Sequence, residues 1–155
     1  MRPKQFAMIM GLAMVIVGLL AFIPSLNVVP STGMPALAID SSYGLFLGYV
    51  PMNSLNKILL ITMGAVGFAL SMAPATALPA SIRWSRILAV LTAVLAIAGL
   101  FPQTYTLFGY MPVYGWNVAA AAIIAVVAAY EGWALSSRVP EQKMAPTRSH
   151  VAGVR

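Results

Sequence analysis

The side chains that could perform catalysis or bind a metal are few in this 155-residue chain, and they stand far apart. The acids are Asp40, Glu131 and Glu141, the single histidine is His150, and there is no cysteine. General acid–base catalysis, a nucleophile–histidine pair and a metal centre each need several such groups in one place. We therefore expect no enzymatic activity, no bound metal and no intrinsic cofactor.

Glu131 is the only acid within an apolar stretch, and an ionisable residue at membrane depth is by default a functional candidate. It lies near the end of its stretch, between Tyr130 and Trp133. We expect a structural ion pair with one of the nearest basic residues, which are Arg83, Arg86 and Arg138. Proton transfer through Glu131 is the alternative.

The elements that must position these side chains are long apolar runs. Hydrophobic residues make up 61% of the chain and charged residues 8%, whereas soluble domains contain about 25% charged residues. Spans are expected at about 6–23, 55–73, 84–101 and 116–135, each near the roughly 20 residues that cross a bilayer core. The fold class predicted is all-α, an integral membrane four-helix bundle over residues 1–135, followed by a polar tail at 136–155.

The positive charges predict the orientation of this bundle. Eight of the nine lie on one side if both termini share that side, and only Lys57 lies on the other. The eight are Arg2, Lys4, Arg83, Arg86, Arg138, Lys143, Arg148 and Arg155. Because basic residues accumulate on the cytoplasmic side of membrane proteins, we expect cytoplasmic N- and C-termini. Anionic lipid head groups, and not nucleic acid, are the expected partners of these charges.

Two nine-residue segments, 48–56 and 109–117, share the pattern G-Y-x-P-x-x-x-x-N, and each leads into a span. The matching positions are Gly48, Tyr49, Pro51 and Asn56 in the first and Gly109, Tyr110, Pro112 and Asn117 in the second. The pattern predicts two tandem helix–loop–helix repeats that enter the membrane from the same side. Proline turns the chain before each new span, and we expect the asparagines to cap or tie helices in preference to binding a ligand.

The loop before the first of these segments is the longer of the two on its side. Pro35 could begin a short interfacial helix over residues 36–48, with Leu37, Ile39 and Leu45 on its apolar face. Such a helix would either dock a partner or cap the bundle.

The last span contains a run of small residues at helical spacing: Ala121, Ala125, Ala128, Ala129 and Gly132. Small side chains let helices approach closely in lipid, where the hydrophobic effect no longer drives association. There are more of them than one neighbouring helix requires, so we expect one face of this span to contact a second protein.

The order of several features resembles that of a bacterial family of small four-span membrane proteins known only as a domain of unknown function. The shared features are a first span that ends in Phe22-Ile23-Pro24, a long loop, then Leu45-Phe46-Leu47-Gly48 and the stretch from Pro51 to Asn56. In that family histidines often flank the asparagine, whereas here the neighbouring positions include Leu55 and Leu59. The resemblance implies a multi-pass protein of the bacterial cytoplasmic (inner) membrane and no defined activity.

These observations together predict a non-catalytic accessory subunit of a larger membrane complex, with respiratory or photosynthetic complexes among the hosts. Grooves between its helices could hold lipid or pigment without histidine ligation. The alternative is a small oligomeric channel or transporter, and an enzyme acting on lipids is disfavoured by the missing side chains.

Overall fold

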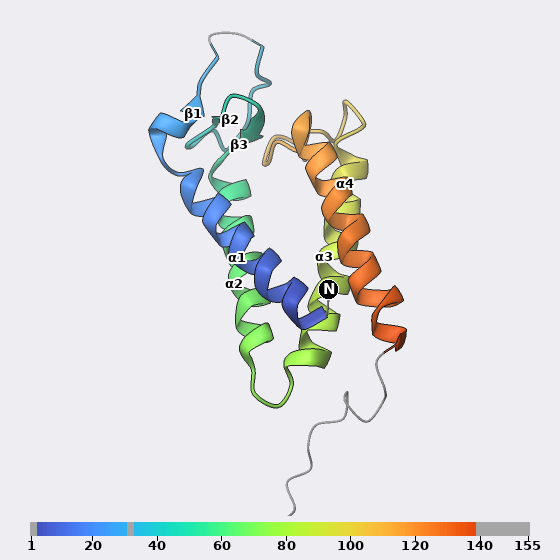
Figure 1. Cartoon of the computed structure of the whole chain (residues 1–155). Coiled ribbons are helices and arrows are strands. Elements are labelled where there is room, and N and C mark those ends of the chain that lie inside the picture. The colour runs from blue at the N-terminus through green and yellow to red at the C-terminus, as the bar shows by residue number, and fades with distance from the viewer. Residues whose placement is uncertain (1–2, 31–32, 139–155) are drawn as a thin grey trace, which may run out of the picture.

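The computed structural model of the chain describes residues 3–30 and 33–138. Four helical segments of the described residues are long and apolar enough to span a membrane. They are α1 (Pro3–Leu20), α2 (Ser54–Met72), α3 (Ala77–Ala98) and the segment Trp116–Ala134, which begins with α4 (Trp116–Ala129). A π-helical turn, Tyr130–Ala134, extends α4. The helices alternate in direction, so α1 begins and α4 ends at the same end of the bundle (Figure 1). The prediction of a mostly helical protein with four spans is confirmed.

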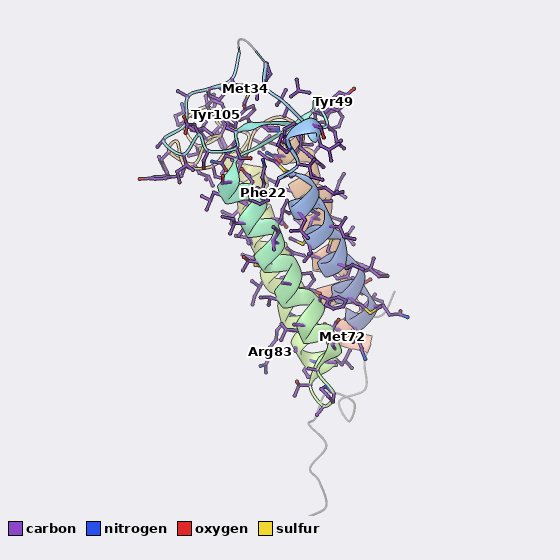
Figure 2. All side chains as sticks on the ribbon, turned by 90° about the vertical axis from the view of Figure 1, so that its left-hand side faces the viewer. Phe22, Met34, Tyr49, Met72, Arg83 and Tyr105 are labelled. Carbon is purple, nitrogen blue, oxygen red and sulfur yellow. The ribbon has the colours of Figure 1, made fainter. Side chains whose placement is uncertain are left out.

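We call the end of the bundle where α1 begins the terminal end, and the opposite one the sheet end. The short link between α2 and α3, residues 73–76, lies at the terminal end (Figure 1). Helix α3 begins at Ala77, several residues before the predicted start at 84, so Arg83 and Arg86 lie within its first turns and not in a loop. Arginine is a good helix former whose apolar stem can lie along a helix while its head reaches water. Arg83 is exposed at this end, opposite Tyr49 and Tyr105 (Figure 2).

The sheet end carries a small antiparallel sheet, so the description of the fold as all-α needs correction. Its strands are β1 (Asn27–Val28), β2 (Gly44–Phe46) and β3 (Val50–Met52), in the order β1-β2-β3. The interfacial helix predicted over residues 36–48 is wrong. Leu47 and Gly48 both have positive φ, 53° and 82°, which a right-handed helix does not allow. They lie in the three-residue loop between Phe46 and Val50, and positive φ suits a tight hairpin turn of this kind. The chain therefore folds back as the β2–β3 hairpin.

The bundle consists of two helix pairs, α1 with α2 and α3 with α4, and contacts between the pairs are fewer than those within them. Glycines bring the backbones of α1 and α2 together. A methyl group on Gly11 would lie 2.6 Å from the carbonyl oxygen of Gly64 and 2.6 Å from the backbone nitrogen of Phe68. The small residues of the first two spans therefore set how closely this pair packs.

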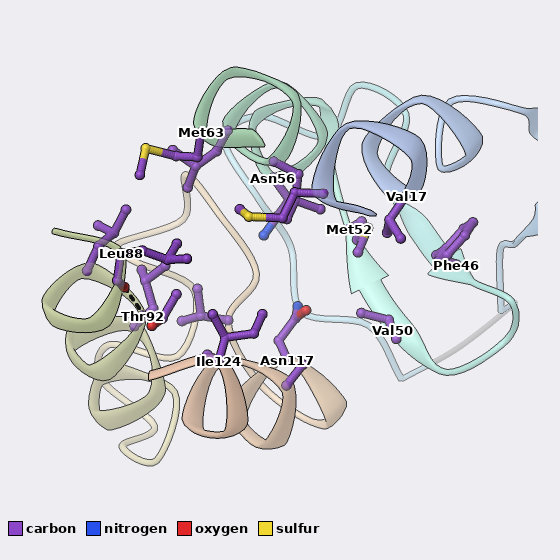
Figure 3. Close-up of a pocket in the computed structure, with 18 of the residues that line it drawn as sticks. Val17, Phe46, Val50, Met52, Asn56, Met63, Leu88, Thr92, Asn117 and Ile124 are labelled. Atoms are coloured by element: carbon purple, nitrogen blue, oxygen red, sulfur yellow. Dashed lines mark hydrogen bonds between the residues drawn. The ribbon is translucent and has the colours of Figure 1, made fainter. Parts of the chain in front are cut away.

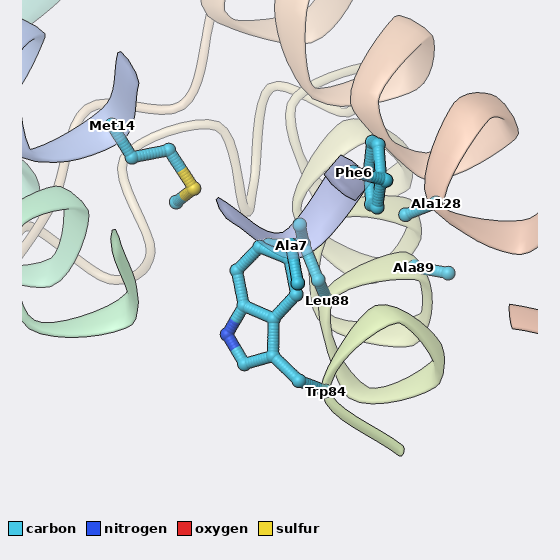
Figure 4. Close-up of a cluster of buried hydrophobic side chains, with 7 residues drawn as sticks. All are labelled: Phe6, Ala7, Met14, Trp84, Leu88, Ala89 and Ala128. Carbon is cyan, nitrogen blue, oxygen red and sulfur yellow. The ribbon is translucent and has the colours of Figure 1, made fainter. Parts of the chain in front are cut away.

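A cluster of buried apolar side chains joins the two pairs near the terminal end (Figure 4). It consists of Phe6, Ala7, Met14, Trp84, Leu88, Ala89 and Ala128. The indole nitrogen of Trp84 donates a hydrogen bond to Met63 O at 3.1 Å, and its ring lies 6.1 Å from that of Phe6 between centroids. Outward-facing side chains such as Val94 and Ile123 are exposed, as expected for a surface covered by lipid tails.

Candidate functional site

A cavity of about 360 Å³ lies between the two helix pairs (Figure 3). All four helices line it, together with the β2–β3 hairpin and the loop before α4. Its walls are almost entirely apolar, and the polar residues among them are Asn56, Thr92 and Asn117. No charged side chain lines this cavity. A volume of this size lies within the range of small-molecule sites.

The two asparagines of the repeated segments form the polar corner of this cavity, and they bind across the two helix pairs. Asn56 Nδ2 donates a hydrogen bond to Pro112 O at 3.1 Å, and Asn117 Nδ2 donates to Pro51 O at 2.6 Å. Asn117 Nδ2 also donates to Pro112 O at 3.0 Å. Each segment thus supplies its asparagine amide to the proline carbonyl of the other. The expectation that the asparagines tie elements together matches this geometry.

The two repeated segments also share a local backbone conformation. Gly48 N donates to Leu45 O and Tyr49 N to Phe46 O, at 3.0 and 3.1 Å. The corresponding bonds in the second segment run from Gly109 N to Thr106 O and from Tyr110 N to Leu107 O, at 3.0 and 3.2 Å. Leu47 and Gly48 have positive φ in the first turn, as Phe108 and Gly109 do in the second. Each turn places its tyrosine on the exposed surface and its proline in the interior.

Asn53 is a buried residue beside Asn56 that the comparison of the two segments missed. It is fully buried and its side chain accepts a hydrogen bond from Asn56 N, which caps the first turn of α2. Its Nδ2 donates to Ile39 O at 2.8 Å and to Tyr110 O at 2.7 Å. The sequence signal was the pair of asparagines three residues apart, a spacing that suits a reciprocal helix cap.

At the position equivalent to Asn53 the second segment has Tyr114, whose hydroxyl lies 2.7 Å from that of Tyr43. Burial, together with this hydrogen bond and the neighbouring tyrosines, raises the pKa of Tyr43 above its usual range. Burial also raises the pKa of Tyr114. Both hydroxyls therefore stay protonated at neutral pH and serve as a structural link between the first loop and the second segment.

Lys57 is fully buried near the sheet end, where its Nζ donates to Ser42 O at 2.8 Å and to Ser42 Oγ at 2.7 Å. The ammonium also lies 5.3 Å from the centre of the Phe22 ring. The side chain thus reaches toward the loop at the sheet end, as a lysine near the end of a span does. Its contacts hold the first loop against α2.

Glu131 and Arg86 lie close in the fold without forming the predicted ion pair. Arg86 Nε donates to Gly132 O at 2.7 Å, and its guanidinium lies 5.7 Å from the centre of the Trp133 ring. Gly132 lies in the π-helical turn, and its carbonyl also accepts a hydrogen bond from Ser136 Oγ at 2.7 Å. Glu131 is only 4% exposed, and its Oε2 has no hydrogen-bond partner among the described residues.

The predicted pairing of Glu131 with Arg83 or Arg86 is thus absent from the part of the chain that the structure describes, since Arg83 is exposed and Arg86 binds the π turn. The side chain of Arg138 lies outside the described residues. Among the residues that the structure describes, there is no group of three or more histidine, cysteine or acidic side chains that could hold a metal ion.

The small residues of the last span divide between four environments. Ala125 and Ala128 are buried, and Ala128 belongs to the core cluster. Ala121 lines the large cavity, and Gly132 packs against the backbone of Arg86. Ala125 and Ala129 also line a shallow groove of about 330 Å³ on the α3–α4 surface. The other residues of this groove, which we call the alanine groove, are Ala89, Val90, Ala93, Val126 and Trp133.

A family model described as a domain of unknown function, DUF4383, matches residues 4–134. The chain belongs to the DUF4383 family. The match covers all four spans, the sheet and both repeated segments, and it confirms the resemblance found from the sequence. No curated protein matches the chain, and no solved structure does. Membership in DUF4383 thus assigns no activity to the cavity or to the alanine groove.

Proposed function

We propose that this chain is a non-catalytic accessory subunit of a larger complex in the bacterial cytoplasmic membrane, with its termini in the cytoplasm. Respiratory and photosynthetic complexes are among the hosts that suit such a subunit. The observation that carries the proposal is the alanine groove, a shallow depression lined by small side chains on the outer surface of the α3–α4 pair.

The shape of the alanine groove suits a transmembrane helix of another subunit. Its floor is alanine from both α3 and α4, and its rim includes the exposed side chains Val90, Val126 and Trp133. A floor without bulky side chains lets a third helix come close, and close packing is the main source of helix association in lipid. A face that met only lipid would have no need of such a floor.

The first test is native mass measurement after gentle detergent extraction of the full chain from its own membrane. We expect a species heavier than one chain that contains a second membrane protein. Ala93→Leu and Ala129→Leu, which fill the groove, should release the chain from this species while its helical content is kept. The matched control is Ala65→Leu, an exposed alanine on α2 outside the groove, which should leave the species intact. A lone monomer from unsubstituted membranes would overturn the proposal.

The alternative function is an oligomeric channel or transporter. The cavity gives this alternative less support, because a conduction path would have to cross the whole bundle. The side chains of Phe6, Trp84 and Leu88 pack together between the cavity and the terminal end and would block such a path. Glu131 would be the proton-carrying group of such a channel. A homo-oligomer that conducts a solute or protons in vesicles, and loses proton flux in a folded Glu131→Gln variant, would replace the accessory-subunit proposal.

We also propose that the bundle arose from two tandem helix–loop–helix units. The matched turns and the exchange of asparagine bonds between the segments support this origin. The first unit then differs from the second mainly by its longer loop, which supplies β1 and the contact between Ala38 N and Gly109 O at 2.8 Å.

A further inference from the structure

We propose that the cavity between the two helix pairs binds one uncharged, single-chain membrane lipid that donates a hydrogen bond, such as a long-chain or isoprenoid alcohol. The proposal is independent of the accessory-subunit function, because it concerns a different surface of the chain. It follows from the volume of the cavity, from the chemistry of its walls and from polar groups in the walls that can accept a hydrogen bond but have no proton left to donate.

The apolar walls of the cavity favour a hydrocarbon ligand. Met10, Met14 and Val17 contribute from α1, while Leu91 and Leu95 contribute from α3 on the opposite side. Protein interiors are close-packed, and side chains around an empty apolar space lose their dispersion contacts. Water would be a poor occupant, because a buried water needs two to four polar partners and the walls offer few. Because the cavity lies between membrane-spanning helices, the hydrocarbon available to fill it is that of the surrounding lipids.

The polar corner of the cavity specifies the head group. Thr92 Oγ1 already donates to Leu88 O at 2.7 Å, so this hydroxyl can accept a hydrogen bond from a ligand but cannot donate one to it. The side-chain oxygen of Asn56 accepts from Asn53 N at 3.2 Å. Both amide hydrogens of Asn117 are used by the two proline carbonyls, which also fixes which side-chain atom is the nitrogen. Asn117 Oδ1 accepts no hydrogen bond from the described residues, so it can accept one from a ligand.

The same walls exclude other classes of lipid. A phosphate or an ammonium would enter a site without a charged partner among its lining residues, and burying an unpaired charge is strongly unfavourable. A volume of 360 Å³ lies near the lower end of the range for ligand sites, which suits one chain better than the two of a phospholipid. A hydroxyl group satisfies Asn117 Oδ1 and brings no charge.

The test uses the purified full chain in phosphatidylcholine nanodiscs and a long-chain alcohol that carries a mid-chain diazirine. Photolysis should give saturable adducts on residues that line the cavity, and unlabelled farnesol should compete. Ala121→Leu, which fills the cavity, should lower saturable labelling roughly fivefold or more. Ala122→Leu should not, because Ala122 is an exposed neighbour outside the cavity. Equal saturable labelling of these two variants, or non-saturable labelling of lipid-facing residues only, would overturn the proposal.

A second arm tests the hydrogen bond. The matching methyl ether of the probe cannot donate, so it should bind roughly threefold to tenfold more weakly than the alcohol. Asn117→Leu should remove this preference and keep saturable labelling, with folding checked by circular dichroism. A preference that persists in the folded variant would overturn the assignment of Asn117 Oδ1. If Asn117→Leu does not fold, the alcohol–ether comparison in the unsubstituted chain decides, and equal affinities overturn the donor requirement.

Discussion

At the scale of single residues, Asn56 and Asn117 make the most informative contacts. Each lies in the first turns of its helix, and each donates across the helix pairs to a proline carbonyl. Proline has no backbone N–H, but its carbonyl is an ordinary acceptor, and Pro51 and Pro112 are both fully buried. A buried carbonyl without a donor is unfavourable. The asparagines therefore satisfy groups that the repeated prolines bring into the interior.

The first residue-scale prediction is a coupling between these two side chains. Asn56→Leu and Asn117→Leu should each lower the free energy of unfolding by about 0.5–2 kcal/mol. Both donate to Pro112 O, so either single variant leaves that carbonyl one donor and the double variant removes both. The double variant should therefore cost more than the sum of the singles. Detergent-based unfolding of the four proteins measures the cycle, and strictly additive costs would contradict the shared acceptor.

Among the described residues, the buried charged side chains Lys57 and Glu131 differ in how the fold accommodates them. Lys57 finds both oxygens of Ser42 and the face of Phe22. Glu131 keeps one oxygen without a partner in the described part of the chain. Since an intramembrane acid with an unsatisfied atom is a functional candidate, Glu131 is the residue whose substitution best separates a proton-conducting role from a structural one.

At the scale of elements, the α1–α2 pair is held by direct backbone approach. Gly64 reciprocates the contact of Gly11, because a methyl group on Gly64 would lie 2.5 Å from Gly11 O and 2.8 Å from Val15 N. Gly18 makes a similar approach to Ile61 and to the carbonyl of Lys57. The glycines of α1 thus lie along one face of the helix that contacts α2.

We predict that Gly11→Ala destabilises the bundle by about 1–3 kcal/mol, because the new methyl group meets backbone atoms that move only if the two helices separate. Ala69→Leu is the control, since Ala69 is exposed on α2 and the larger side chain meets lipid. Thermal unfolding in detergent measures both. A Gly11→Ala variant as stable as the control would show that α1 and α2 do not approach this closely.

At the scale of the molecule, the sheet lies at one end of the bundle, and the terminal end, where α1 begins and α4 ends, is the opposite one (Figure 1). The distribution of basic residues predicts that the terminal end lies in the cytoplasm. The natural absence of cysteine makes this assignment easy to test, because any introduced cysteine is the only thiol in the chain.

We predict that a membrane-impermeant maleimide added to spheroplasts with an intact inner membrane labels the Gln103→Cys variant and does not label the Ala75→Cys variant. Gln103 is exposed in the loop at the sheet end, and Ala75 is exposed in the link between α2 and α3. Ala75→Cys should become reactive only after the membrane is opened. The reverse pattern would place the basic end outside the cell and overturn the assigned orientation.

The membrane character of the chain and the number of its spans could be predicted from the sequence, because an apolar run of sufficient length satisfies its own backbone as a helix in lipid. The third helix began earlier than predicted because Arg83 and Arg86 were taken for a loop, although arginine is compatible with helix. The hairpin was missed because positive φ at Leu47 has no sequence signature of its own.

The repeated segments show most clearly which features could be predicted from the sequence and which could not. Their sequence alone determined that a proline-containing turn precedes a helix twice, since proline and glycine restrict or free the backbone at their own positions. Only the tertiary structure decided that Asn56 and Asn117 bind the opposite segments, that Ala121 and Ala129 face different surfaces, and that a cavity remains between the helix pairs. The physical reason is that local conformation and membrane partition depend on neighbouring residues, whereas these contacts depend on how closely distant helices pack.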